Sequence, residues 1–133
     1  MCHWSDSLHS GNKGKVGELA VRKDLVRSGY NIYIPECDTA QVDLIVECHT
    51  GIIKKVQIKT AYKLKTETSL EIDTRKYIDT GRVDIIAIYY EPEDIIAYVP
   101  FENNRSINLA LRTALNNQNE GRKWFYSYSR FPE

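Results

Sequence analysis

The sequence predicts a mixed α/β fold in which a central mixed β-sheet is flanked by helices. One helical pattern near the N-terminus precedes a chain that is otherwise dominated by strands. A polar turn at 48–51 separates two Val- and Ile-rich arms with a two-residue period, so residues 41–60 are predicted to form a β-hairpin. Residues 83–90 are almost continuously apolar, the pattern of a strand buried on both faces. An α+β arrangement of the same elements is the alternative.

The predicted helix spans residues 14–28. Gly29 follows it, and glycine readily takes the left-handed conformation in which many helices end. Apolar residues at helical spacing form one face, which consists of Val16, Leu19, Ala20 and Val26. Val21 and Leu25 lie on a second flank, so we expect the helix to be covered on more than one side. Residues 1–12 are polar and are predicted to be a loosely held lead-in.

Within the hairpin, the alternation separates an apolar face from a polar one. Asp43 lies on the polar face of the first arm, and Gln57 and Lys59 lie on the polar face of the second. With the turn at 48–51, residues that face each other have numbers that sum to about 100, which places Asp43 beside Gln57. A carboxylate, an amide oxygen and an ammonium are therefore expected on one patch.

Shorter elements complete the predicted sheet. They are strands at 30–34, 95–99 and 105–112, a helical turn at 73–78, and a terminal strand at 123–131. Residues 65–71 form a polar run that could be mobile. The segment 105–112 also fits a helix, and the aromatic side chains of 123–131 could stack on nucleic-acid bases instead of packing on the core.

The chain has 133 residues, which is the size of one domain, 1–133, with a core of its own. Its net charge is zero, which argues against a strongly basic nucleic-acid binder. The charges are nevertheless unevenly distributed, with eight Lys or Arg and four acids in 51–82, and five acids and no base in 83–103. This leaves room for one basic face, and an unevenly charged solvated surface explains the counts equally well.

The cysteine pattern and the absence of long apolar runs indicate the expected compartment. Cys2, Cys37 and Cys48 are too widely spaced for a disulfide framework or a zinc site of the CxxC type. The sequence shows no signal peptide and no run of membrane length. We therefore expect a soluble, cytoplasmic protein without a membrane partner.

Four side chains have the chemistry for phosphodiester hydrolysis, which needs a divalent cation on oxygen ligands, a positioned water and positive charge near the phosphate. Asp43 and the Gln57 amide oxygen could hold the metal, with the backbone carbonyl of Ile58 as a third ligand. Glu18 on the helix could orient a metal-bound water or complete a second metal site. Lys59 could orient the attacking water or stabilise the developing charge on the phosphate.

These residues, in this order, resemble the PD-(D/E)XK nuclease core that restriction enzymes and Holliday-junction resolvases share. The closer resemblance is to the group I intron-associated homing endonucleases of that superfamily. The motifs that carry it are GKVGE (14–18), VDLI (42–45), VQIKT (56–60), GRVD (81–84), AYVP (97–100) and NNQ (116–118), followed by Gly121 and Trp124. Two positions depart from the superfamily pattern: Gln57 replaces the usual Glu, and Val42 replaces the proline before the catalytic acid.

The resemblance implies a restriction-endonuclease-like core and a Mg²⁺-dependent endonuclease that cuts double-stranded DNA and leaves 5′-phosphate ends. Mn²⁺ could substitute for Mg²⁺. A homodimer or homotetramer is implied, because one small domain has one active site and a duplex has two strands. The candidate phosphate contacts are Lys13, Lys15, Lys54, Lys55, Lys63 and Lys65.

Two other functions compete with site-specific homing. A junction resolvase or repair nuclease would recognise DNA shape, and an inactive DNA-binding or assembly module would explain the neutral Gln57. Some polar residues also have purely structural explanations: Lys59 could protect an edge strand, Asp84 could be a hydrogen-bond acceptor within the sheet, and Tyr62 and Tyr77 could serve only packing.

Overall fold

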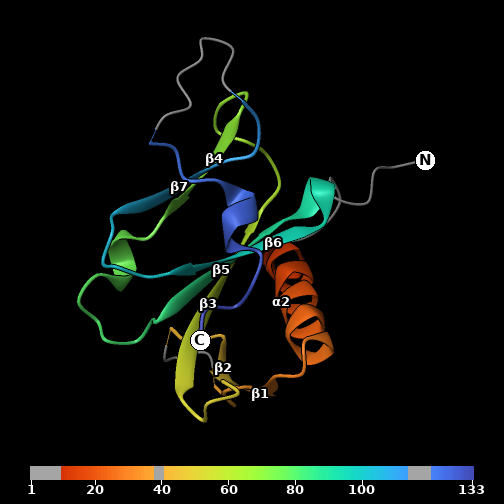
Figure 1. The fold of residues 1–133 in the computed structure, drawn as a ribbon, viewed down its shortest axis with the longest axis vertical. Coiled ribbons are helices and arrows are strands. Elements are labelled where there is room, and N and C mark those ends of the chain that lie inside the picture. Colours follow the sequence, from red (N-terminus) through yellow and green to blue (C-terminus); the bar gives the residue numbers. More distant parts are fainter. Residues whose placement is uncertain (1–9, 38–40, 114–120) are drawn as a thin grey trace.

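A five-stranded mixed sheet lies at the centre of the computed structural model, which describes residues 10–37, 41–113 and 121–133 (Figure 1). Its strands, in spatial order, are β1 (Asn31–Tyr33), β2 (Leu44–Glu47), β3 (Ile53–Ala61), β5 (Ile85–Tyr90) and β6 (Ile95–Pro100). Only β3 and β5 run parallel, and the other neighbours are antiparallel. The predicted mixed sheet and its hairpin are confirmed.

The helix α2 (Ser10–Arg27) covers one face of this sheet. Gly29 follows it with a φ of +87°, as predicted. The predicted apolar face was wrong, because Leu19 and Val26 are 55% and 58% exposed, whereas Val21 and Leu25 are buried. Counting apolar residues alone overlooked Gly17, which is buried at the same helical spacing as Val21 and Leu25 and brings this side of the helix against the sheet.

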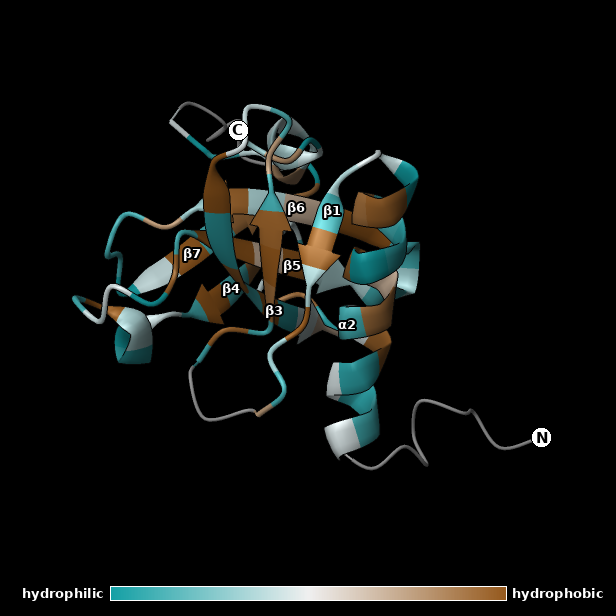
Figure 2. Cartoon of the chain, turned by 90° about the horizontal axis from the view of Figure 1, so that it is seen from below, coloured by the Kyte–Doolittle hydropathy of each residue, from teal (hydrophilic) through white to brown (hydrophobic). Residues whose placement is uncertain are grey.

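Two clusters of buried residues form the core, one on each face of the sheet. Along β5 all six residues are buried, and they alternate between the clusters: Ile85 and Ala87 face α2, and Ile86 and Ile88 face the other side. Hydrophobic residues accordingly run along the length of β5 (Figure 2). A strand buried on both faces was predicted here, and it is confirmed.

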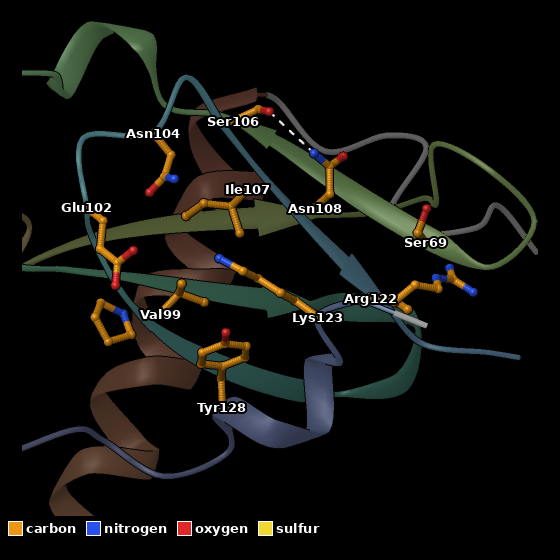
Figure 3. Close-up of a pocket in the computed structure, with 13 residues that line it drawn as sticks. Ser69, Val99, Glu102, Asn104, Ser106, Ile107, Asn108, Arg122, Lys123 and Tyr128 are labelled. Atoms are coloured by element: carbon orange, nitrogen blue, oxygen red, sulfur yellow. Dashed lines mark hydrogen bonds between the residues drawn. The ribbon is translucent and has the colours of Figure 1, made fainter. Parts of the chain in front are cut away.

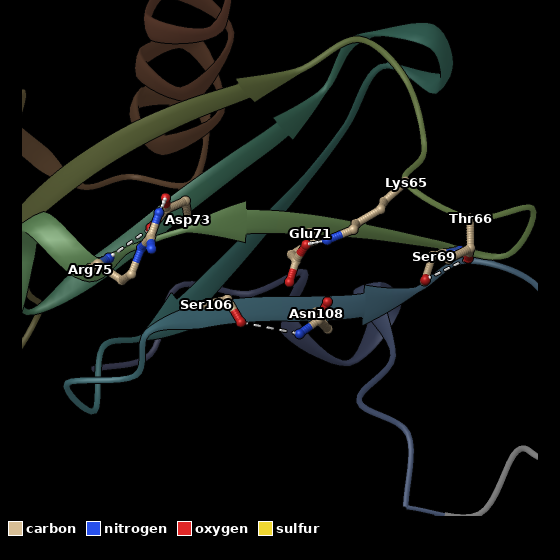
Figure 4. Close-up of polar contacts among 8 residues, drawn as sticks. All are labelled: Lys65, Thr66, Ser69, Glu71, Asp73, Arg75, Ser106 and Asn108. Carbon is tan, nitrogen blue, oxygen red and sulfur yellow. Dashed lines mark hydrogen bonds and ion pairs between the residues drawn. The ribbon is translucent and has the colours of Figure 1, made fainter.

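A second, two-stranded sheet contributes to the cover of the face opposite α2. It consists of β4 (Ser69–Asp73) and β7 (Ser106–Ala110). The remaining elements are three 3-10 helices: η2 (Arg75–Tyr77), η3 (Glu91–Glu93) and η4 (Phe125–Tyr128). The strand prediction for 105–112 is confirmed. The end of the polar run at 65–71 belongs to β4, in which alternate residues pack inward and leave a polar outer face (Figure 4).

The predicted terminal strand at 123–131 was also wrong. Its residues form η4, and within the described residues only Trp124 makes a strand-like bridge, to Ala110. Phe125 and Phe131 are buried and Tyr126 is 53% exposed, so the burial does not follow a two-residue period. The helix begins within the predicted lead-in of 1–12, while residues 1–9 and the NNQ motif at 116–118 lie outside the described residues. Among the residues described, no helix is both long and apolar enough to cross a membrane.

Candidate active site

The register of the hairpin brings Asp43 and Gln57 together. Leu44 pairs with Val56, and the same register continues to the pair of Glu47 with Ile53 beside the turn, as the sequence predicted. Asp43 directly precedes β2 and its N–H donates to the Val56 carbonyl at 2.9 Å. Asp43 therefore lies at the end of β2, beside the part of β3 that carries Gln57.

The carboxylate of Asp43 is held against β3. Its Oδ2 accepts a hydrogen bond of 2.7 Å from the backbone N–H of Ile58. In an extended strand the N–H and C=O of one residue point to the same side, so the Ile58 carbonyl is also directed toward the edge at which Asp43 lies. Asp43 and Ile58, which carry two of the three predicted metal-binding oxygens, are thus in direct contact.

The third predicted oxygen belongs to Gln57, and it is buried without a partner. Its Oε1 has no hydrogen-bond partner among the residues that the structure describes. An unsatisfied buried acceptor lowers the stability of a fold unless something else binds it. An amide oxygen is a suitable ligand for a hard divalent cation, so the residues present fit such an ion.

Lys59 lies on the same face of β3 as Gln57 and is half-buried. The explanation that it protects an edge strand was wrong, because β3 is the third of five strands and has neighbours on both sides. Its ammonium lies 5.1 Å from the centre of the Tyr77 ring. Gln57 and Lys59 thus share one face of β3, and Asp43 is hydrogen-bonded to Ile58 between them, so the three residues form one patch.

Glu18 follows Gly17, the residue at which α2 comes closest to β3. A Cβ atom at position 17 would lie 1.8 Å from Oγ1 of Thr60, so α2 and β3 touch one residue beyond Lys59. The Glu18 carboxylate lies 2.8 Å from the Lys15 ammonium and 3.7 Å from the Arg22 guanidinium. The structure therefore brings the three hairpin residues together, and it holds Glu18 in ion pairs on its own helix.

The carboxylates near the hairpin differ in role. Asp84 accepts a 2.8 Å hydrogen bond from the N–H of Lys55, and its own N–H donates to the Lys55 carbonyl, so the prediction of a structural acceptor is confirmed. Among residues 10–37, 41–113 and 121–133, no three His, Cys, Asp or Glu side chains gather closely enough to hold a metal ion. A metal at this patch would consequently need neutral oxygen ligands such as the one Gln57 offers.

The six lysines predicted to contact phosphate do not form one continuous face. Lys54 and Lys55 point to opposite faces of β3, and the Lys55 ammonium donates to the Gly81 carbonyl at 2.6 Å. Lys65 pairs with Glu71 on the outer face of β4 (Figure 4). Lys13 lies 5.6 Å from the ring centre of Tyr62.

A cavity of about 400 Å³ lies away from the hairpin, between β6, β7 and the C-terminal segment (Figure 3). Its lining includes amide, hydroxyl and cationic side chains, among them Asn104, Asn108, Lys123 and Tyr128. None of its lining residues comes from α2, β2 or β3. The sequence offered no signal for it, because the lining comes from several separate segments.

Residues 8–131 match the family model described as PD-(D/E)XK endonuclease. The chain belongs to this family. Protein 5.3 of Escherichia phage T7 is 32% identical over 92 residues, which span 64% of this chain and 75% of that protein. A bacterial homing endonuclease, I-Ssp6803I, has a similar structure, with a TM-score of 0.67 and 20% identity over 90% of this chain and 86% of that chain. This likeness confirms the restriction-endonuclease-like fold.

The motif in the family name matches the hairpin of this chain with two exceptions, Val42 in place of the proline and Gln57 in place of the second acid. Asp43 corresponds to the first acid and Lys59 to the lysine, with one residue between Lys59 and Gln57. Gln57 stands where the motif has a second acid, so this endonuclease has a neutral oxygen at that position. Tyr77, for which the sequence suggested only packing, lies beside Lys59, and only the folded structure shows this proximity.

Proposed function

We propose that the chain is a Mg²⁺-dependent endonuclease that hydrolyses phosphodiester bonds in double-stranded DNA at specific sites. The observation that supports this most strongly is the patch on the hairpin, where the Asp43 carboxylate and the unpartnered Gln57 oxygen meet the ammonium-bearing face of β3. Family membership and the structural neighbour support an endonuclease, and Mg²⁺ dependence and site specificity are our own proposals.

In this proposal three oxygens hold the ion: those of the Asp43 carboxylate, the Gln57 amide and the Ile58 carbonyl. When bound, a divalent cation would polarise the phosphate and increase the acidity of a coordinated water. The N–H of Ile58 fixes the Asp43 carboxylate before substrate arrives, which reduces the reorganisation needed for catalysis. Because Gln57 is neutral, it attracts the cation less strongly than a carboxylate would.

Lys59 and Glu18 act on the water and the phosphate in this proposal. The Lys59 ammonium orients the attacking water and stabilises the negative charge that develops on the phosphate. Glu18 orients the water from α2, and for this its carboxylate must exchange its present ion pairs with Lys15 and Arg22 for that contact. Gly17 allows α2 to lie close to β3 at Thr60.

Double-stranded cleavage requires a site for each strand, so we propose that the active form is a homodimer or homotetramer. The six lysines named above are proposed phosphate contacts. Each contact should reduce the logarithm of DNA affinity by about 0.9 per logarithmic unit of salt.

A single substitution tests the proposed cleavage. Asp43→Asn removes the charge and retains an oxygen that can accept the Ile58 hydrogen bond, so the fold should be preserved. We expect Mg²⁺-dependent cleavage of duplex DNA to fall by about 100-fold or more. Glu47→Gln is the matched control, since Glu47 lies on the same face at the other end of β2, and it should cleave at the wild-type rate.

Wild-type protein that cuts no DNA in either Mg²⁺ or Mn²⁺ would favour an inactive binding module, which the neutral Gln57 makes a specific alternative. Faster cutting of branched than of linear duplexes would favour a junction resolvase or repair nuclease. Equal loss of cleavage in Asp43→Asn and Glu47→Gln would contradict the site.

A further inference from the structure

Tyr77 lies in the core cluster on the face of the central sheet opposite α2, close to the proposed cleavage site. The residue is 1% exposed, and its ring packs edge-on against Phe101 with 6.4 Å between ring centres. Its hydroxyl is buried and has no hydrogen-bond partner within the described part of the chain. The ring is therefore fixed by packing and not by a hydrogen bond of its hydroxyl.

The turn that carries Tyr77 is anchored to the chain before β7. Thr74 is fully buried, and its hydroxyl donates to the Asn104 carbonyl at 2.5 Å. The N–H of Thr74 donates to the Arg105 carbonyl at 3.0 Å, and the N–H of Tyr77 donates back to the Thr74 carbonyl at 3.0 Å. These contacts give the ring a defined position relative to the central sheet.

Two ammonium groups lie close to this ring. The Nζ of Lys59 is 5.1 Å from the ring centre and the Nζ of Lys76 is 5.2 Å from it. Cations within about 6 Å of an aromatic face are attracted by the negative potential of the ring. A lysine side chain otherwise has four rotatable bonds, so this attraction restricts where the Lys59 ammonium lies.

The charges around Tyr77 connect it to the hairpin patch. Burial raises the pKa of the Tyr77 hydroxyl, the Lys76 charge opposes this shift, and the Asp43 carboxylate adds to it. Hydrogen bonds from Arg75 lower the pKa of Asp73 to about 2 (Figure 4). The charge of Lys59 contributes to the same shift. The Lys59 ammonium is thus attracted by the Asp73 carboxylate as well as by the Tyr77 ring.

We propose that Tyr77 is a positioning residue of the cleavage site, whose ring face holds the Lys59 ammonium on the patch shared with Asp43 and Gln57. This inference rests on the proposed function, because it assigns Tyr77 a role only through Lys59. Tyr77 itself does not contact the substrate in this account. Its effect on cleavage should therefore disappear when Lys59 is absent.

Two substitutions distinguish the effect of the Tyr77 ring face from the effect of its hydroxyl. Tyr77→Phe keeps the ring face, and it should cost no stability because the hydroxyl has no partner. Its cleavage rate should remain within about threefold of wild type. Tyr77→Leu removes the ring face, and its single-turnover cleavage rate should fall by about tenfold while its DNA affinity changes by less than about threefold. Phe101→Leu is the control for a lost core ring, because it destabilises the same cluster without removing the ring beside Lys59.

A readout independent of cleavage is the proton NMR shift of the Lys59 methylene next to the ammonium. The ring current of Tyr77 should move this signal upfield in wild type and Tyr77→Phe, and the displacement should vanish in Tyr77→Leu. In a Lys59→Met background, Tyr77→Leu should leave the residual cleavage rate unchanged. Absence of the displaced signal, or an equal further loss of rate in the Lys59→Met background, would overturn the role of Tyr77. If wild type cleaves and Tyr77→Leu cleaves equally fast, only this inference fails, whereas a wild-type protein without cleavage overturns the proposed function as well.

Discussion

The contact between Gly17 and Thr60 determines how close α2 comes to β3, and replacing Gly17 by Ala tests it. The added Cβ would lie 1.8 Å from Thr60 Oγ1 and 3.1 Å from its Cβ. The strand or the helix must therefore move by about 1.2 Å to reach an acceptable separation. Thr60 cannot simply rotate away, because a β-branched side chain has few rotamers within a packed interface.

The magnitude follows from two opposing effects. Overpacking of this kind costs about 1–3 kcal/mol. Replacing a helical glycine by alanine stabilises the helix by about 1 kcal/mol. The net loss of unfolding free energy for Gly17→Ala should therefore be about 0–2 kcal/mol, which corresponds to a fall of up to about 6 °C in Tm for a chain of this size.

Thermal denaturation of a small set of variants measures this effect. Gly14→Ala is the matched control, since nothing lies within 4 Å of a Cβ at that position, and it should raise Tm. Thr60→Ala removes the clashing Oγ1, which has no hydrogen-bond partner within the described part of the chain, so the double variant Gly17→Ala/Thr60→Ala should recover stability. Cleavage should follow the same pattern, because Glu18 moves with the helix. Equal Tm values for Gly14→Ala and Gly17→Ala, or no recovery in the double variant, would refute the close contact.

Three further predictions concern the site and the helix. Gln57→Glu places a carboxylate where a buried oxygen has no partner, so it should lower unfolding free energy by about 2 kcal/mol in EDTA and recover it in excess Mg²⁺; equal Tm values in both buffers would contradict metal binding there. Lys59→Met should reduce single-turnover cleavage by about 100-fold with little loss of DNA affinity, and cleavage at the wild-type rate would remove its proposed role. Tyr98→Phe removes the 2.5 Å hydrogen bond that the Tyr98 hydroxyl donates to Asp24 on α2, and denaturant unfolding should show a loss of about 1–2 kcal/mol. Burial and this bond raise the pKa of Tyr98, so its contribution is present below the pKa of about 10 in the unfolded chain and is lost as pH rises further; Tyr98→Phe should therefore flatten the fall of stability above pH ~10, and an unchanged slope would contradict it.

The strands of the central sheet could be predicted from the sequence because their patterns are local. Two-residue alternation and a four-residue turn determine the pairing of Leu44 with Val56, and so place Asp43 beside Gln57. The buried strand β5 was equally evident, because almost every residue in it is apolar. These features depend on neighbours in the chain and require no knowledge of tertiary packing.

The remaining features depend on contacts between distant segments. The buried side of α2 is determined by a glycine facing Thr60, and hydrophobic periodicity contains no information about such a close approach. The aromatic residues after 123 have a two-residue period, yet Phe125 is buried within a 3-10 helix because it joins the core cluster beneath β7. Similarly, the ring of Tyr77 lies next to Lys59, eighteen positions earlier in the sequence, and this proximity could not be predicted from composition.

The most direct test of the proposed metal site is to locate a bound ion. Crystals of the wild-type protein soaked in Mn²⁺ should show anomalous scattering from an ion between the Asp43 carboxylate, the Gln57 Oε1 and the Ile58 carbonyl. Asp43→Asn crystals treated in the same way should lack it, and Glu47→Gln crystals should retain it. An ion bound elsewhere, or no ion at the hairpin in wild-type crystals, would contradict the assignment of this patch as the metal-dependent cleavage site.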